Sequence, residues 1–138
     1  MMDFSALLQN QRAYFRTGAT AAPASRKAAL HTLYTLIDQN RAAIAHALGQ
    51  DLGKSETESY LCEIGLTLRE IRFLMGHVGR WARPRRCRTD LANFPGRSFT
   101  VSEPYGCVLV MAPWNYPFLL CMEPLAGAIA AGNCCIVN

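Results

Sequence analysis

Apolar residues recur at helical spacing along the first part of the chain. A short helix is expected over residues 3–17, ending near Gly18. Residues 25–48 predict one longer helix, with Gly49 as its end. Its apolar positions are Leu30, Leu33, Tyr34, Ile37, Ile44 and Leu48. The first fifty residues are therefore expected to form two helices joined by a small-residue connection over residues 19–23.

The clearest helical pattern follows Ser55. Ser55 and Glu58 have the spacing of a capping box, which predicts a helix start at this point. Apolar residues then follow in steps of three and four until the helix ends before Pro84; they are Leu61, Ile64, Leu68, Ile71, Met75 and Val78. Such a stripe is typical of core or helix–helix contact, so it is given no cofactor role.

A change of pattern occurs after residue 97. Residues 98–102 alternate weakly and predict a strand, and residues 103–106 interrupt the pattern as a turn. The apolar run 107–112, with Val108 and Val110, is typical of a strand buried on both faces of a parallel sheet.

The last thirty residues complete one supersecondary unit. Residues 118–131 predict a helix that Gly132 ends and that Pro124 should kink. A second apolar run covers residues 134–137. Residues 107–137 therefore predict a strand–helix–strand unit with parallel strands, which places the chain in the α/β class.

Composition indicates a globular protein. Hydrophobic residues make up 51% of the chain and charged residues 17%. The first residues lack the basic and apolar segments of a secretory signal, which favours the cytoplasm. Residues 106–137 carry one charge, Glu123, which makes an integral membrane protein the alternative. Pro113, Pro117 and Pro124 break this stretch, and it is too short between them to span a bilayer.

The net charge of +4 has a single source. Six arginines occupy positions 80, 83, 85, 86, 88 and 97, against Asp90 alone, so the remaining eight basic and nine acidic residues nearly cancel. This run could bind phosphate. Pro84 and Pro95 instead favour a solvated connection, and no nucleic-acid partner is expected.

Cysteine and histidine spacing predicts no metal site. The six cysteines form no Cys-x-x-Cys pair, and the three histidines are scattered. At least four cysteines lie in apolar helix or strand contexts, which favours buried, reduced thiols over disulfides.

Asn115 is the best candidate for chemistry. It lies just past the strand 107–112, where ligands bind in open α/β folds, and Pro113 and Pro117 stiffen the turn around it. A side-chain amide can donate to an oxyanion without carrying charge. The alternative is that Asn115 only caps the helix that follows.

Several motifs resemble the aldehyde dehydrogenase superfamily, and its class 3 type most of all. The strongest are Glu103-Pro104-Tyr105-Gly106, residues 108–118 with Ala112-Pro113-Trp114-Asn115-Tyr116-Pro117, and residues 124–133. Asp51-Leu52-Gly53-Lys54-Ser55-Glu56, Glu63-Ile64-Gly65, Trp81-Ala82-Arg83-Pro84 and Phe94-Pro95 are also similar. The likeness spans roughly residues 45–137.

The resemblance implies a fold and a division of the chain. Residues 1–97 would be an N-terminal helical region and connection, and residues 98–138 the start of a Rossmann-like NAD(P)-binding domain. The family is several times longer, so the chain is expected to be its N-terminal part, with the catalytic cysteine and the general-base glutamate beyond it. Asn138 stands where the family usually has a lysine that contacts the adenosine ribose.

The resemblance also implies an activity. Asn115 matches the oxyanion donor, and Met111, Ala112, Pro113 and Trp114 match the segment beside the nicotinamide of NAD or NADP. Structural packing is the alternative for Trp114. An aldehyde substrate and a homodimer follow by analogy, and the 138 residues alone are expected to be inactive. A non-catalytic helical interaction module is the alternative function.

Overall fold

The computed structural model describes residues 4–138. The helices are α1 (Phe4–Arg16), α2 (Pro23–Gln39), α3 (Arg41–Leu52), α4 (Glu56–Ser59), the π-helical turn η1 (Tyr60–Ile64), α5 (Gly65–Trp81), the 3₁₀ turn η2 (Leu91–Asn93) and α6 (Pro117–Ala131). The strands are β1 (Arg85–Cys87), β2 (Ser98–Thr100), β3 (Cys107–Val110) and β4 (Cys134–Val137). None of the helices among these residues is both long and apolar enough to cross a bilayer.

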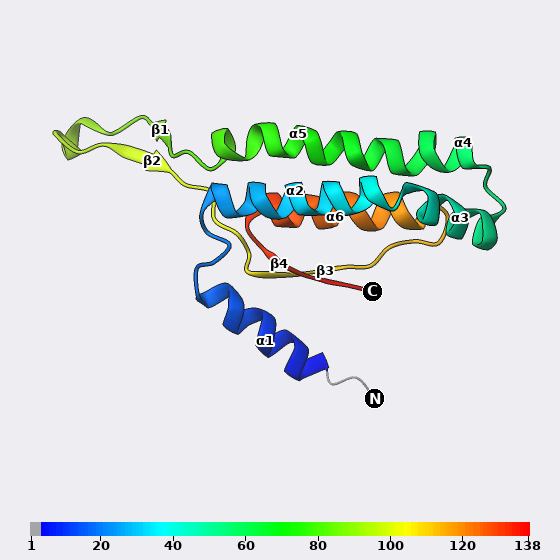
Figure 1. Cartoon of the computed structure of the whole chain (residues 1–138). Helices are drawn as coiled ribbons and strands as arrows, with labels where there is room; N and C mark the ends of the chain where they lie inside the picture. Colours follow the sequence, from blue (N-terminus) through cyan, green and yellow to red (C-terminus); the bar gives the residue numbers. More distant parts are fainter. Residues whose placement is uncertain (1–3) are drawn as a thin grey trace.

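Three helices form the body of the molecule. Helices α2, α5 and α6 pack against one another, and the strands β3 and β4 lie beneath α6 (Figure 1). Helix α1 contacts the strands from the opposite side, so the small sheet lies between α6 and α1 (Figure 1). Mixed helices and strands in this order confirm the predicted α/β class.

The core is shared by all three central helices. Its fully or nearly fully buried members are Leu30, Ile37, Ala45, Ile64, Leu68, Ile71, Leu74, Val78, Ala126 and Ala130. Burying one side chain of the size of Leu30 or Ile71 stabilises the fold by about 1.5–3 kcal/mol. The buried residues of α6 are alanines, whose small size lets its backbone approach α2 and α5 closely, and Phe118 and Ile129 are partly buried against the same core.

The predicted strand–helix–strand unit is confirmed. Strands β3 and β4 are parallel, with Cys107 opposite Cys134. The Asn133 side chain fixes this register because its Oδ1 accepts a 2.8 Å hydrogen bond from the Gly106 N–H. Gly132 ends α6 with a φ of 91°, a left-handed conformation that favours glycine.

The predicted helix over residues 25–48 is wrong in its continuity. Asn40 interrupts it with a φ of −106° and a ψ of 16°, so α2 ends and α3 begins there. The Asn40 Nδ2 donates a 2.7 Å hydrogen bond to the Leu36 carbonyl, which stabilises the break. Gly49 does not end the helix; α3 continues to Leu52, and Gly53 caps it at a φ of 67°.

The helix that starts after Ser55 is confirmed, but it is not regular. The Ser55 Oγ accepts a 3.1 Å hydrogen bond from the Glu58 N–H, as a helix cap does. One π-helical turn, η1, then inserts an extra residue between α4 and α5. The extra residue changes which side chains face the core. Leu61 is exposed, whereas Glu63 and Ile64 are both buried.

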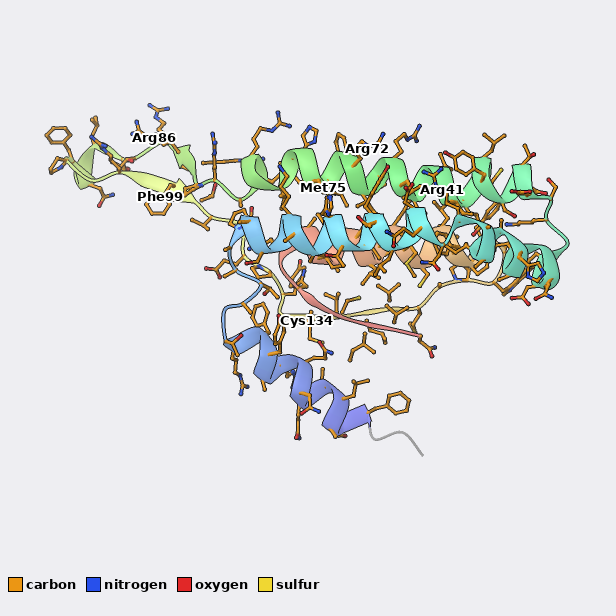
Figure 2. The ribbon with its side chains drawn as sticks, viewed as in Figure 1. Arg41, Arg72, Met75, Arg86, Phe99 and Cys134 are labelled. Atoms are coloured by element: carbon orange, nitrogen blue, oxygen red, sulfur yellow. The ribbon has the colours of Figure 1, made fainter. Side chains whose placement is uncertain are left out.

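Two expectations for the strands need correction. The arginine-rich connection is exposed, but it also forms β1, which pairs antiparallel with β2 so that Arg86 lies opposite Phe99. Figure 2 shows both residues on a hairpin that projects from the helices. Strand β3 is not buried on both faces: Val110 is buried, whereas Leu109 stays 58% exposed although α1 contacts the strands from the side opposite α6.

Gly65 is expected to be required by the π-helical turn. Its N–H bonds the Tyr60 carbonyl, and a Cβ added at Gly65 would lie 2.9 Å from that oxygen. Gly65→Ala should therefore lower the free energy of unfolding by about 1–2 kcal/mol, although alanine favours helices. Urea unfolding followed by circular dichroism measures this.

Gly76→Ala in the same helix is the matched control, because a Cβ there meets nothing within 4 Å. It should raise the stability by about 0.5–1 kcal/mol. Equal effects of the two substitutions would show that the π-helical turn does not depend on Gly65.

Candidate active site

The candidate site is the turn between β3 and α6. Residues 111–116 follow the carboxyl end of β3 and lead into α6, and the carboxyl end of β4 lies at the same edge. The turn reaches the end of the molecule where α3 and α4 are joined (Figure 1). This edge is where open α/β sheets bind ligands.

The predicted cofactor-side residues lie together on this turn. Met111 and Trp114 are 72% and 82% exposed, so the described chain does not bury either side chain. Trp114 therefore has no packing role in the described core. Pro113 is also exposed, and Ala112 is half-buried. Asn138 is held nearby, since its N–H donates a 3.1 Å hydrogen bond to the Val110 carbonyl.

The Asn115 side chain is exposed and has no hydrogen-bond partner within residues 4–138. It does not cap α6, because Tyr116 occupies the N-cap position and the amides of the first turn are bonded elsewhere. The capping alternative is therefore wrong. The carboxamide of Asn115 is left free to donate to a ligand.

Glu63 caps α6 from a distant helix. Its Oε2 accepts hydrogen bonds from the N–H groups of Phe118, at 2.9 Å, and Leu119, at 3.1 Å. These two donors have no partner within the helix, and a carboxylate also favours the positive end of the helix dipole. Glu63 is completely buried, and η1 is the element that turns it inward.

Lys54 joins this carboxylate to the candidate turn. Its Nζ forms an ion pair with Glu63 Oε1 and donates a 3.1 Å hydrogen bond to the main-chain carbonyl of Asn115. The same ammonium lies 4.1 Å from the centre of the Tyr116 ring, in a cation–π contact. The Lys54 side chain is only 9% exposed, so the pair is largely desolvated.

Charges buried in this way are strongly interdependent. Removing one partner of a buried ion pair leaves the other uncompensated and typically costs about 3–5 kcal/mol. Sequence reasoning assigned no role to either residue. Two signals were present: both residues fall in motifs that resemble the family, and Glu63 is a carboxylate directly beside Ile64 of the apolar stripe.

Three cysteines of this region have thiols that are not activated as nucleophiles. Burial raises the pKa of the Cys121, Cys134 and Cys135 thiols, and the neighbouring Cys107 adds to the effect at Cys134 and Cys135. A raised pKa lowers the thiolate fraction at neutral pH, and the thiolate is the reactive form. All six cysteines are free thiols, and no group of three potential metal ligands occurs in residues 4–138.

The fold and the site together define the class of protein: an α/β chain whose free amide and exposed aromatic residue stand at the carboxyl edge of a parallel sheet. A family model described as "Aldehyde dehydrogenase family" matches residues 2–138. The chain belongs to the aldehyde dehydrogenase family.

Curated relatives agree with this assignment. The chain is 42% identical over 129 residues to the 4,4'-diaponeurosporen-aldehyde dehydrogenase of Staphylococcus aureus, covering 94% of this chain and 28% of that protein. It is 40% identical over 126 residues to aldehyde dehydrogenase family 3 member F1 of Arabidopsis thaliana, covering 91% and 26%. The chain thus spans less than a third of the length of these relatives.

Solved structures share the fold. The substrate-bound state of Staphylococcus aureus AldH matches with a TM-score of 0.94 and 40% identity, over 99% of this chain and 30% of that one. The NAD+ complex of an aldehyde dehydrogenase from Bacillus cereus matches with a TM-score of 0.82 and 24% identity, over 96% and 26%. The second likeness concerns the fold alone.

The thiol environments predict an order of alkylation. Iodoacetamide at pH 7.5 should label Cys87, which is exposed, well before Cys121, Cys134 and Cys135, whose pKa values burial raises. Mass spectrometry of peptides from the native protein measures the order. If Cys121, Cys134 and Cys135 were labelled as fast as Cys87, the burial of their thiols would be contradicted.

Proposed function

We propose that the chain is the N-terminal part of an NAD(P)-dependent aldehyde dehydrogenase that oxidises aldehydes to carboxylic acids. The observation that carries the proposal is the uncommitted carboxamide of Asn115 at the carboxyl edge of the sheet. Family membership supports it. Solved structures that share this fold include aldehyde dehydrogenases in complex with NAD+ and with NADP+.

Asn115 has a definite role in this reaction. When a cysteine thiolate attacks an aldehyde carbon, the carbonyl oxygen acquires negative charge and needs donors already in place. The Asn115 amide supplies one of these donors without a charge that would trap the thiolate. The resemblance assigns the cysteine, and the glutamate that activates water for hydrolysis of the thioester, to other parts of the enzyme.

The residues of the turn fit a nicotinamide cofactor. Met111 and Trp114 present exposed apolar surface beside Asn115, which suits one face of a planar ring. Ala112 and Pro113 would add to this apolar surface, chiefly with main-chain atoms. Met111, Ala112, Pro113 and Trp114 would hold the nicotinamide ring of NAD or NADP, which when bound would supply the hydride acceptor for aldehyde oxidation.

The remaining assignments stay predictions. They are the division of the chain into residues 1–97 and 98–138, a homodimer in the complete enzyme, the cytoplasm as its location, and the inactivity of residues 1–138 alone. An aldehyde of medium or long chain, or an aromatic aldehyde, is the proposed substrate class by analogy with the family.

Asn115→Ala in the complete enzyme that carries this chain should lower kcat about a hundredfold or more, because one preorganised donor is lost. The dissociation constant for NAD(P)+ should change little. Steady-state NADH formation and cofactor titration measure the two quantities.

Asn10→Ala is the matched control, since Asn10 is exposed on α1, away from the turn. It should leave kcat unchanged. A fall in kcat of less than about fivefold for Asn115→Ala would exclude the oxyanion role and favour a helical module without this chemistry.

Trp114→Ala should raise the KM for NAD(P)+ about five- to tenfold, because it removes the largest apolar surface of the turn. Tyr105→Ala is the control: Tyr105 is 96% exposed but precedes β3, at the opposite end of the strand. Equal KM values for the Trp114 variant and the unsubstituted enzyme would contradict a cofactor-side position.

A further inference from the structure

We propose that Lys54 and Glu63 act as positioning residues that hold the Asn115 amide at the place where the substrate oxygen becomes charged. The inference rests on the function proposed above. It adds two residues that neither touch the reacting atoms nor belong to the turn itself.

The first step is the way in which the turn is anchored. Lys54 Nζ holds the carbonyl of Asn115, and Glu63 Oε2 holds the N–H groups of Phe118 and Leu119. Since Lys54 and Glu63 form an ion pair, the same buried pair binds the main chain before Pro117 and after it. The backbone between Asn115 and Leu119 is thereby fixed to the helical layer.

The second step is the target of the lysine. Of the carbonyls in the turn, Lys54 binds that of Asn115, the same residue whose side chain is free. Within the described residues, no hydrogen bond holds the side chain of Asn115 itself. The orientation of its side-chain amide therefore depends on the position of the Asn115 main chain. A shift of about 1 Å in such a group can reduce a rate by about a hundredfold.

The third step concerns cost. A buried ion pair is often no more stabilising than apolar residues of the same volume. Keeping this one requires a π-helical turn to aim Glu63 inward, and a glycine, Gly65, to allow that turn. A gain in stability does not explain such an arrangement. Accurate placement of the Asn115 main-chain carbonyl does explain it.

A double-mutant cycle in the complete enzyme tests the inference. In the folded enzyme, Lys54→Met should lower kcat by about tenfold or more while the KM for NAD(P)+ stays within about twofold, because the placement of the Asn115 amide matters in the transition state and not for cofactor binding. In an Asn115→Ala background, Lys54→Met should lower kcat by less than about twofold further, because the group that it positions is gone.

A second variant guards against loss of folding. Lys54→Met combined with Glu63→Gln removes both charges but keeps a carbonyl oxygen for the amides of Phe118 and Leu119. It should fold, as judged by circular dichroism, and show the same low kcat. Arg41→Met is the control: it breaks the exposed Asp38–Arg41 ion pair and should leave kcat unchanged.

Hydrogen exchange of the enzyme without cofactor gives a readout that does not depend on activity. In the variant with both Lys54→Met and Glu63→Gln, the amides of residues 115, 116, 118 and 119 should exchange about tenfold or more faster, while those of α2 should not change. Unchanged exchange at residues 115, 116, 118 and 119 would overturn the inference.

The outcomes separate this inference from the function on which it rests. If Asn115→Ala lowers kcat as expected but Lys54→Met multiplies that loss by its full single-variant effect, the ion pair acts elsewhere and only the positioning role is excluded. If Asn115→Ala changes kcat little, the oxyanion role and the positioning role fail together.

Discussion

The structure depends on one buried ion pair. Glu63 supplies the negative group that the first turn of α6 needs, and Lys54 supplies the charge that lets Glu63 stay buried. Helix α6 in turn packs on α2 and α5 and carries the connection to β4. The same pair therefore anchors the helix that unites the core and the turn that carries the candidate chemistry.

In this arrangement, capping of α6 and donation to a ligand are carried out by different residues. A carboxylate from another helix satisfies the start of α6, so no residue of the turn is needed as its cap. Asn115 keeps a free carboxamide on a backbone that is held by its carbonyl. Preorganisation of this kind is what electrostatic stabilisation of a developing oxyanion requires, because the donors cannot afford to reorient during the reaction.

Much of the fold was predictable, since local patterns encode it. The strand–helix–strand unit and Gly132 followed from apolar runs bounded by a glycine, and the position of Asn115 followed from Pro113 and Pro117. The break at Asn40 was missed because apolar spacing continues across it. The ion pair was missed for a different reason: Lys54 and Glu63 act on residues more than fifty positions away, and helical periodicity holds no information about such contacts. The π-helical turn that buries Glu63 also violates the period used to find the helix.

A crystal structure of the complete enzyme with an aldehyde-derived thiohemiacetal would test the central claim most directly. The account predicts that Asn115 Nδ2 lies about 2.7–3.1 Å from the former aldehyde oxygen. It also predicts that Lys54 Nζ still binds the Asn115 carbonyl in that complex. An Asn115 amide turned away from that oxygen, with Lys54 released from the turn, would contradict it.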